Sequence, residues 1–320
     1  MKITRKKFLV FNTISPMLIF NKIVSLFILL VCVTLCLVSC DKKQKRSEPQ
    51  IGLNNYYLTP GTDLTTDYKR IASVSPQVTE MLCALGCKDR LLCRTDFCNF
   101  PKDIKNITSV GGINNADVEK IISLHPDIVI CSSIFTKRMV QMLEDASLSV
   151  LSFKEGNKIE DMYSVMTILG KITSKEAIAD SLIADCKKRL EIVSNNCKQI
   201  LKTTKSDKPK VYYVVGFGSG GDFSAGEDTY INEIFTLAGA DNIAKNAKNW
   251  SFNKEELFKN QPEYIFVRSE DKETFKRTHP YSELKAVKNN KVIGIDDLDT
   301  QTPRSIDAIE FIFKTIYKIK

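Results

Sequence analysis

Short apolar runs alternate with amphipathic segments from about Tyr68 to the C-terminus. This alternation is typical of α/β units, in which helices connect buried parallel strands. In the first half, Ser75-Pro76 predicts a helix directly after the first strand, because serine is a good N-cap and proline suits the first helical position. The strands expected from the apolar runs are 70–74, 91–94, 127–131 and 150–153 in the first half and 210–215, 264–268 and 291–295 in the second. The second-half helices are expected at 228–238, 254–260 and 304–319.

One amphipathic pattern is much longer than the others. Its apolar residues recur every three or four positions with no Gly or Pro between 173 and 208, and they are Ile178, Leu182, Cys186, Leu190, Val193, Cys197 and Leu201. A helix of this length spans roughly 45 Å. A coiled-coil arm is the alternative, although the stripe is short for one. We therefore predict two lobes, at 67–172 and 204–320, joined by a single long helix at 173–203.

A weak internal repeat relates the two halves. In the first copy, Glu119 is followed by an apolar stretch, then by Pro126 and an acid, and then by a buried strand. In the second copy, Glu255 is followed in the same order by Pro262, an acid and the strand at 264–268. Each copy indicates a glutamate in the first turn of a helix that leads into a strand. The two lobes are therefore expected to be built alike.

The N-terminal region differs from the rest of the chain. Residues 1–40 contain five basic residues and no acid, and residues 23–38 are almost wholly apolar. This layout is typical of a secretory signal, and Leu37-Val-Ser-Cys40 looks like a bacterial lipobox. We expect a lipoprotein signal peptide at 1–39 and a lipidated Cys40 with a flexible tether at 40–66. An uncleaved membrane anchor is the alternative, and the start codon could be Met1 or Met17.

The net charge of +8 comes mostly from that N-terminal region. Beyond residue 50, the chain carries 37 Lys and Arg against 36 Asp and Glu. A nearly neutral body argues against a basic surface that binds nucleic acid. The four basic residues among residues 41–50 suit an anionic lipid surface instead.

The sequence contains few residues or motifs that indicate an enzyme. Residues 216–221 have the G-x-G-x-x-G spacing of dinucleotide sites, but a polar stretch follows where a helix N-terminus should meet the phosphates. The chain has two histidines, His125 and His279, and none of the common hydrolase or zinc-protease motifs. We therefore expect no catalytic residues and no enzyme. An anchored nucleotide-dependent oxidoreductase is the alternative from that class.

The cysteines predict neither a metal site nor a clear disulfide framework. Seven follow Cys40 and none forms a C-x-x-C pair, so we expect no bound metal and no cofactor. Cys186 and Cys197 are three helical turns apart, too far for a bridge. A disulfide among four others stays open: Cys83, Cys87, Cys93 and Cys98. A lipoprotein that binds metal directly is a further alternative.

From about Tyr68 onward, the chain resembles the class III periplasmic solute-binding proteins of ABC importers, which bind cobalamin, ferric siderophores or haem. The resemblance is carried by Arg70-Ile-Ala-Ser-Val-Ser-Pro-Gln-Val-Thr-Glu80, Leu85-Gly86, Thr95-Asp-Phe-Cys-Asn-Phe-Pro101, Val110-Gly-Gly112, 119–129, Ala238-Gly-Ala-Asp-Asn242 and Pro303-Arg304. It implies an α/β fold of two Rossmann-like lobes bridged by one long helix. It also implies a periplasmic, lipid-anchored monomer of the cell envelope that binds a small molecule and serves a membrane permease.

The resemblance further implies two docking residues. Glu119 and Glu255 match the glutamates, one on each lobe, that dock on arginines of the dimeric permease. Such contacts would fix the orientation of the two proteins through charge-assisted hydrogen bonds. From the residues alone, the favoured role of each glutamate is to stabilise its own helix, because an acid in the first turn favours the positive end of the helix dipole.

Ligand-binding residues follow from the same resemblance. Phe97, Phe223 and Trp250 match aromatic pocket positions, and Gly218 and Gly220 lie in a loop at the cleft edge. Aromatic faces suit a large flat ligand. We therefore expect cobalamin or another corrinoid, which brings its own cobalt, with a ferric siderophore or haem as the alternatives.

Overall fold

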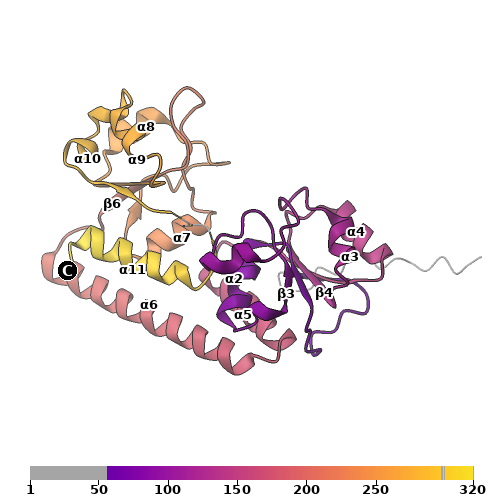
Figure 1. Cartoon of the computed structure of the whole chain (residues 1–320). Helices are drawn as coiled ribbons and strands as arrows, with labels where there is room; N and C mark the ends of the chain where they lie inside the picture. The colour runs from indigo at the N-terminus through magenta and orange to yellow at the C-terminus, as the bar shows by residue number, and fades with distance from the viewer. Residues whose placement is uncertain (1–55, 297, 299, 320) are drawn as a thin grey trace, which may run out of the picture. The chain divides into compact units, whose positions relative to one another are not determined.

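The computed structural model describes residues 56–296, 298 and 300–319, which belong to one compact unit (Figure 1). The predicted signal peptide, the predicted lipidation site Cys40 and most of the predicted tether lie outside the described residues. No helix in the described part of the chain is both long and apolar enough to cross a membrane.

The N-terminal lobe is built on a five-stranded sheet with the order β1-β5-β4-β2-β3. Its strands are β1 (Tyr56–Leu58), β2 (Ile71–Ser73), β3 (Leu91–Cys93), β4 (Ile128–Ser132) and β5 (Ser149–Phe153). All neighbours are parallel except β1, which runs antiparallel to β5. The helices are α2 (Pro76–Ala84), α3 (Val118–Ser123), α4 (Lys137–Asp145) and α5 (Ile159–Ile172), with 3₁₀ turns η1 (Lys88–Arg90) and η2 (Lys102–Asn106). Every residue of β4 is buried, as expected for a central parallel strand.

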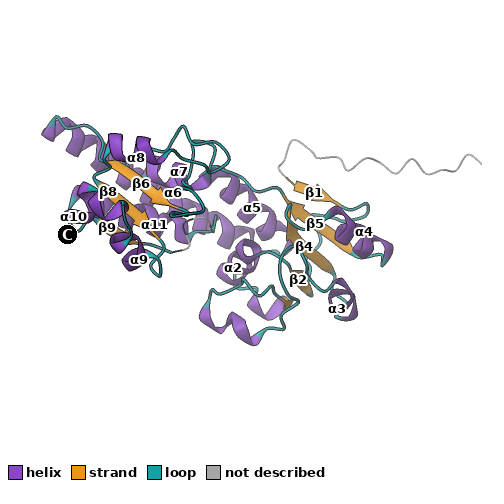
Figure 2. Cartoon of the chain, turned by 90° about the horizontal axis from the view of Figure 1, so that it is seen from above, coloured by secondary structure: helices purple, strands orange, loops and turns teal. Residues whose placement is uncertain are grey.

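The C-terminal lobe is built on a four-stranded parallel sheet with the order β7-β6-β8-β9. Its strands are β6 (Lys210–Val214), β7 (Asp241–Asn242), β8 (Tyr264–Val267) and β9 (Val292–Gly294). Its helices are α7 (Tyr230–Leu237), α8 (Lys254–Asn260), α9 (Lys272–Arg277), α10 (Lys285–Lys288) and α11 (Arg304–Tyr317), with the 3₁₀ turn η3 (Tyr281–Glu283). Figure 2 shows the two sheets as separate sets of strands, each accompanied by helices.

The two sheets share one strand order, because β3-β2-β4-β5 corresponds to β7-β6-β8-β9. The corner between helix and strand is also repeated. His125 and Gln261 both adopt a positive φ, 47° and 45°, immediately before a proline. The acid after that proline then accepts a backbone N–H from the neighbouring strand: Asp127 accepts from Arg70, and Glu263 accepts from Lys210. The internal repeat in the sequence is therefore a repeat of structure.

Helix α6 (Glu176–Thr204) is a single helix of 29 residues, about 43 Å long. It packs on α5 of the first lobe and on α7 and α11 of the second. Its buried residues Ala179, Cys186, Val193 and Cys197 belong to one apolar core that continues through both lobes. The predicted α/β fold of two Rossmann-like lobes with a long connecting helix is confirmed.

The seven cysteines of the described chain are free thiols, and six of them are buried. Burial raises the pKa of Cys83 to about 11 and the pKa of Cys93 to about 12, so both thiols stay protonated near neutral pH. Within the described residues, no group of three or more His, Cys, Asp or Glu side chains is placed to hold a metal ion.

Candidate functional site

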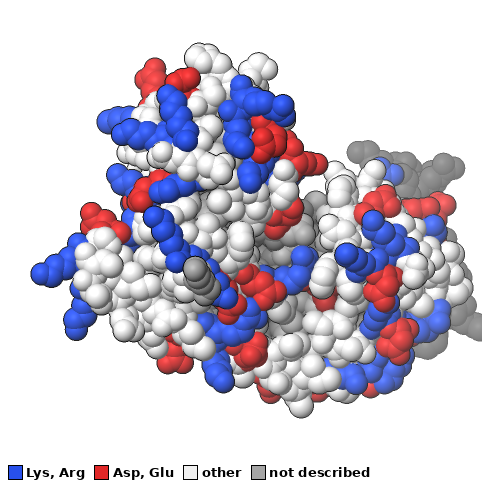
Figure 3. Space-filling model, turned by 60° about the vertical axis from the view of Figure 1, so that its left-hand side comes forward, with Lys and Arg blue, Asp and Glu red and all other residues white. Residues whose placement is uncertain are grey.

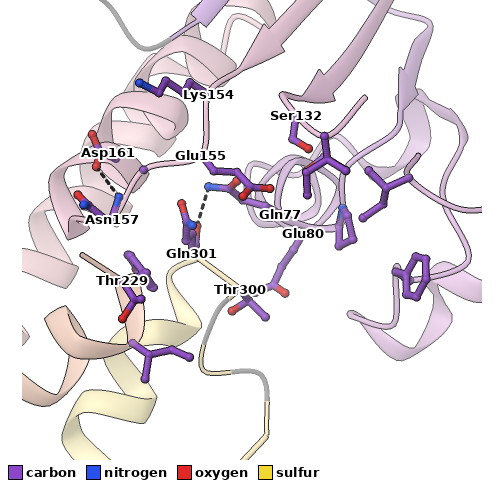
Figure 4. A pocket seen from close by; sticks show the side chains of 18 of the residues that line it. Gln77, Glu80, Ser132, Lys154, Glu155, Asn157, Asp161, Thr229, Thr300 and Gln301 are labelled. Atoms are coloured by element: carbon purple, nitrogen blue, oxygen red, sulfur yellow. Dashed lines mark hydrogen bonds between the residues drawn. The ribbon is translucent and has the colours of Figure 1, made fainter. Parts of the chain in front are cut away.

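A cavity of about 1110 Å³ is lined by residues that follow strands of both sheets. Ser132 ends β4 and Lys154 comes directly after β5, whereas Asp228, Asn249 and Thr300 follow β6, β7 and β9. The carboxyl ends of parallel strands are the usual place for ligands in open α/β sheets. Figure 3 shows a hollow on one face of the molecule with charged side chains of both signs around it, and Figure 4 shows the pocket from close by.

Large apolar side chains remain exposed in this pocket. Phe97 is 62% exposed, Phe100 41%, Ile134 46% and Trp250 43%, and all four line the cavity. Covering an aromatic or aliphatic side chain contributes roughly 1.5–3 kcal/mol to association. The first three side chains come from the N-terminal lobe and Trp250 from the C-terminal lobe, so a ligand between them would contact both.

Trp250 is held in an unusual backbone conformation. It sits in a turn closed by a hydrogen bond from the Ser251 N–H to the Lys248 carbonyl oxygen, 3.0 Å apart. The central residues Asn249 and Trp250 have φ values of 50° and 64°. A bulky side chain in this left-handed region costs about 1–2 kcal/mol. The Ser224 N–H donates to the Trp250 carbonyl oxygen at 2.7 Å, which ties the turn to the neighbouring segment and keeps the indole in the pocket wall.

Uncharged polar groups supply much of the remaining lining. The amides are Gln77, Asn99, Asn157, Asn249 and Gln301, and the aliphatic hydroxyls are Ser75, Ser132, Thr229 and Thr300. Gln77 donates its side-chain N–H to the Gln301 carbonyl oxygen at 3.0 Å, so this contact joins the two lobes across the pocket (Figure 4). Such groups can both donate and accept hydrogen bonds to a ligand that carries amides.

Two ion pairs involve charged side chains of the pocket. Arg304 at the start of α11 donates two hydrogen bonds to Glu80 on α2, at 2.8 and 2.6 Å. The Glu80 residue is only 6% exposed, and the guanidinium also lies 4.2 Å from the centre of the Phe100 ring. Lys158 forms an ion pair with Glu233 at 2.7 Å. Both pairs connect the lobes. The described lining contains three basic residues, Lys154, Lys158 and Arg304, and four acidic ones, Glu80, Glu155, Asp161 and Asp228, so the two signs are nearly equal in number.

The described lining residues include no histidine, cysteine or methionine. The one phenol among them, Tyr230, is 4% exposed, and burial raises its pKa well above the usual range. Haem iron is normally held by His, Cys, Met or Tyr side chains. The described part of the pocket therefore offers no exposed side chain of these types to a haem iron.

The residues predicted to bind ligand separate into two groups. Phe97 and Trp250 line the cavity, whereas Phe223, Gly218 and Gly220 are not among its described lining residues. Phe223 packs over Gly216, where an added Cβ would lie 3.1 Å from the Phe223 ring. Gly218 donates its N–H to the hydroxyl oxygen of Tyr281 at 3.0 Å. The glycine-rich loop is thus anchored within the C-terminal lobe and outside the pocket.

Glu119 and Glu255 occupy equivalent places in the two lobes. Each is exposed and is the second residue of its helix, α3 or α8. The N-caps are supplied by Asp117, which accepts from the Lys120 N–H at 2.9 Å, and by Asn253, which accepts from the Glu255 N–H at 2.6 Å. Among the described residues, neither glutamate carboxylate forms an ion pair. Both remain open to an outside partner.

Comparison with known proteins agrees with this architecture. A family model described as periplasmic binding protein matches residues 71–298. An uncharacterized ABC transporter substrate-binding lipoprotein of Bacillus subtilis is 29% identical over 256 residues, which cover 78% of this chain and 80% of that protein.

Two solved structures share the fold. A periplasmic haem-binding protein from Pseudomonas aeruginosa aligns with a TM-score of 0.70 and 20% identity, over 79% of this chain and 94% of that one. A periplasmic vitamin B12-binding protein of Vibrio cholerae aligns with a TM-score of 0.65 and 20% identity, over 79% of this chain and 98% of that one.

Proposed function

Because the chain belongs to the periplasmic binding protein family, we propose that it captures cobalamin or a related corrinoid between its lobes and delivers it to an ABC transporter permease. Members of this family are the non-enzymatic, solute-binding components of ABC importers, and on that ground the oxidoreductase alternative is set aside.

The chemistry of the pocket supports a corrinoid. A corrin ring is large and flat, bears amide side chains on its periphery, and in cyanocobalamin carries no net charge. Phe97 and Trp250 offer apolar faces from opposite lobes, and amides and hydroxyls surround them. The cavity is at the upper end of the usual size range for ligand pockets. This combination of exposed rings and uncharged polar groups is the observation that carries the proposal.

Haem is the second candidate, because a haem-binding protein is among the similar structures. Against it stands the described lining, which offers no exposed His, Cys, Met or Tyr to the iron. Ferric siderophores are often anionic and need cations to bind them. In the pocket, Arg304 and Lys158 are already committed to Glu80 and Glu233. Figure 4 shows the end of Lys154 directed away from the centre of the cavity.

Fluorescence of Trp250 tests the ligand directly, because the chain contains one tryptophan. We expect cyanocobalamin to quench it with saturable one-to-one stoichiometry and to raise the melting temperature. Haemin and ferric siderophores are expected to do neither. Absence of both effects with cyanocobalamin would remove the corrinoid while leaving the family membership intact.

A matched pair of variants connects the signal to the pocket. Phe97→Ala removes an exposed ring from the lining and is expected to weaken cyanocobalamin binding about tenfold or more. Ile192→Ala removes an exposed apolar side chain from α6, outside the pocket, and should leave the affinity unchanged. Equal affinities for the two variants would place the ligand elsewhere.

The remaining parts of the proposal concern the membrane. Glu119 and Glu255, equivalent and unpaired within the described residues, are proposed to dock on arginines of the permease. The lipobox-like sequence that ends at Cys40 supports a lipid anchor on the extracytoplasmic side of a membrane. The similar Bacillus protein is named as a lipoprotein, which is consistent with such an anchor.

A further inference from the structure

The glycine-rich segment 216–221 forms a narrow loop after β6. The Gly216 and Phe223 backbones exchange hydrogen bonds at the base of the loop, at 3.3 and 3.0 Å. Gly218 and Gly221 have φ values of 99° and 108°, which glycine adopts without strain. The Gly221 N–H closes the turn onto the Gly218 carbonyl oxygen at 3.3 Å. The geometry is that of a short hairpin, and no helix begins at its last glycine.

This loop has no counterpart in the other lobe. In the N-terminal lobe, β2 ends at Ser73 and α2 begins at Pro76. In the C-terminal lobe, the corresponding strand β6 ends at Val214 and the next helix begins at Tyr230. Since the two sheets share their strand order, segment 215–229 is an addition to a repeated framework. The end of this segment, Asp228 and Thr229, lines the pocket, whereas its glycine-rich part at 216–221 is not among the described lining residues. That part therefore calls for a role other than contact with the ligand.

A buried cluster fixes the base of the loop to helix α8. The Asp222 side chain is only 5% exposed; it accepts a hydrogen bond from the Tyr281 hydroxyl at 2.6 Å and lies 3.4 Å from the Lys254 ammonium. The Phe252 N–H donates to the Asp222 carbonyl oxygen at 2.9 Å. Lys254 is the first residue of α8 and immediately precedes Glu255. The cluster therefore holds the loop beside the proposed docking carboxylate.

The tip of the loop, in contrast, is open. Ser219 and Gly220 are exposed, and an added Cβ on Gly220 would meet no atom within 4 Å. Among the described residues, no hydrogen bond reaches the backbone of Ser219 or Gly220. Packing within the chain does not require glycine at 220. With no side chain on Gly220 and a small one on Ser219, the tip lets another polypeptide approach its backbone closely.

We propose that the loop tip at Ser219 and Gly220 forms, with Glu255, the docking surface of the C-terminal lobe, and that a permease loop lies across it. The proposal rests on the proposed docking function of Glu255. Two residues of chain span at most about 7 Å, so Gly220 lies near Asp222 and hence near the start of α8. A standard interface covers about 800 Å² on each partner, which is ample for both features. The partner's backbone would meet the free N–H and carbonyl groups of the tip while its arginine meets Glu255.

The test places a side chain on the tip. Gly220→Gln should leave the melting temperature and the cyanocobalamin-induced quenching of Trp250 unchanged, because no described residue lies within 4 Å of a Cβ at that position. Binding of the full-length chain to its detergent-solubilised transporter should weaken at least tenfold. Ser219→Gln enlarges an existing exposed side chain and serves as the second variant. Ser206→Gln is the control, because Ser206 is exposed and lies at the opposite, amino end of β6.

Glu255→Arg, measured in parallel, separates the two proposals. If Glu255→Arg leaves transporter binding intact, the docking function itself is wrong. If Glu255→Arg abolishes binding while Gly220→Gln and Ser219→Gln bind normally, docking stands and the role of the loop is refuted. If either loop variant weakens cyanocobalamin binding instead, the loop belongs to the ligand site and the inference is overturned.

Discussion

Glu80 is an unusual residue because its carboxylate is nearly buried in the wall of a ligand pocket. It is stabilised by two hydrogen bonds from Arg304, a residue of the other lobe. Losing one partner of such a pair leaves the other charge poorly solvated, which costs more than the pair itself contributes. Both residues line the pocket, and the Arg304 guanidinium also lies against the Phe100 ring, so the pair helps to position that ring.

We expect Glu80→Gln to lower the free energy of unfolding by about 2 kcal/mol, since it removes the nearly buried carboxylate to which Arg304 donates two hydrogen bonds. Thermal denaturation should show a melting temperature lower by roughly 4 °C. Glu191→Gln, on the exposed face of α6, is the matched control and should leave the transition unchanged. Equal melting temperatures for the two variants would show that the interlobe pair contributes nothing to stability.

Sequence reasoning identified some pocket residues and missed others for a geometrical reason. Phe97 and Trp250 were predicted from the resemblance to the solute-binding family, and both line the cavity. Glu80 and Arg304 lie 224 residues apart, and only the folded chain brings them together. Phe223 failed to reach the pocket because its ring covers Gly216. Whether a side chain in a loop points into the pocket depends on the backbone conformation of that loop. The types of residue in the sequence do not reveal this conformation.

At the scale of elements, helices α6 and α11 are joined by an ionic cluster. Arg189 of α6 donates to Glu310 of α11 at 2.8 and 2.9 Å, and to Asp307 at 2.6 Å. Its hydrogen bonds hold the pKa of Glu310 below the ordinary glutamate value. The pKa of Glu310 is lower in the folded than in the unfolded chain. Its carboxylate therefore stabilises the fold at pH values above the ordinary glutamate pKa, and this contribution is lost as the pH falls through the lowered pKa.

We therefore expect Glu310→Gln to reduce stability at neutral pH and to flatten the loss of stability on acidification below about pH 4.3. Urea denaturation at neutral pH and at successively lower pH values measures this difference. The Arg189→Gln variant should behave similarly, because it removes the cause of the lowered pKa. A Glu310→Gln protein with the same pH profile as the parent chain would contradict the assignment.

The strands and helices were predictable where apolar patterns are long. The helix expected at 254–260 is found at Lys254–Asn260, and the buried strands agree within one or two residues. Strand β1 was missed because it has only three residues, is half-buried at the edge of the sheet, and lies in the segment expected to be a tether. Strand β7 was missed because it has only two residues. Short elements such as α10 depend on contacts with the rest of the fold and carry no sequence period of their own.

At the scale of the whole molecule, both lobes share one apolar core through α6. The lobes are therefore connected by packed side chains as well as by the chain itself. A connection of this kind keeps the separation of surface features on the two lobes nearly constant, because a packed helix resists bending. Two carboxylates on separate lobes, Glu119 and Glu255, can then act as a spaced pair toward one partner.

Reversal of either charge tests this pair. We expect Glu119→Arg and Glu255→Arg each to weaken binding to the transporter at least tenfold, and the double variant to abolish uptake in reconstituted vesicles, because each change opposes a guanidinium with a like charge. Cyanocobalamin binding should be unchanged in all three proteins. Glu191→Arg serves as the control for added positive charge, and full uptake by the double variant would refute docking through these residues.

The added loop after β6 acquires a particular importance because the two lobes are otherwise so alike. Equivalent glutamates on equivalent helices give the molecule an approximate two-fold symmetry, and the proposed partner, a dimeric permease, would have a two-fold axis of its own. Two such surfaces could meet in either of two orientations related by half a turn. Segment 215–229 is present on one lobe only. It gives the docking face a polarity, so the two halves of a symmetric permease would meet different surfaces.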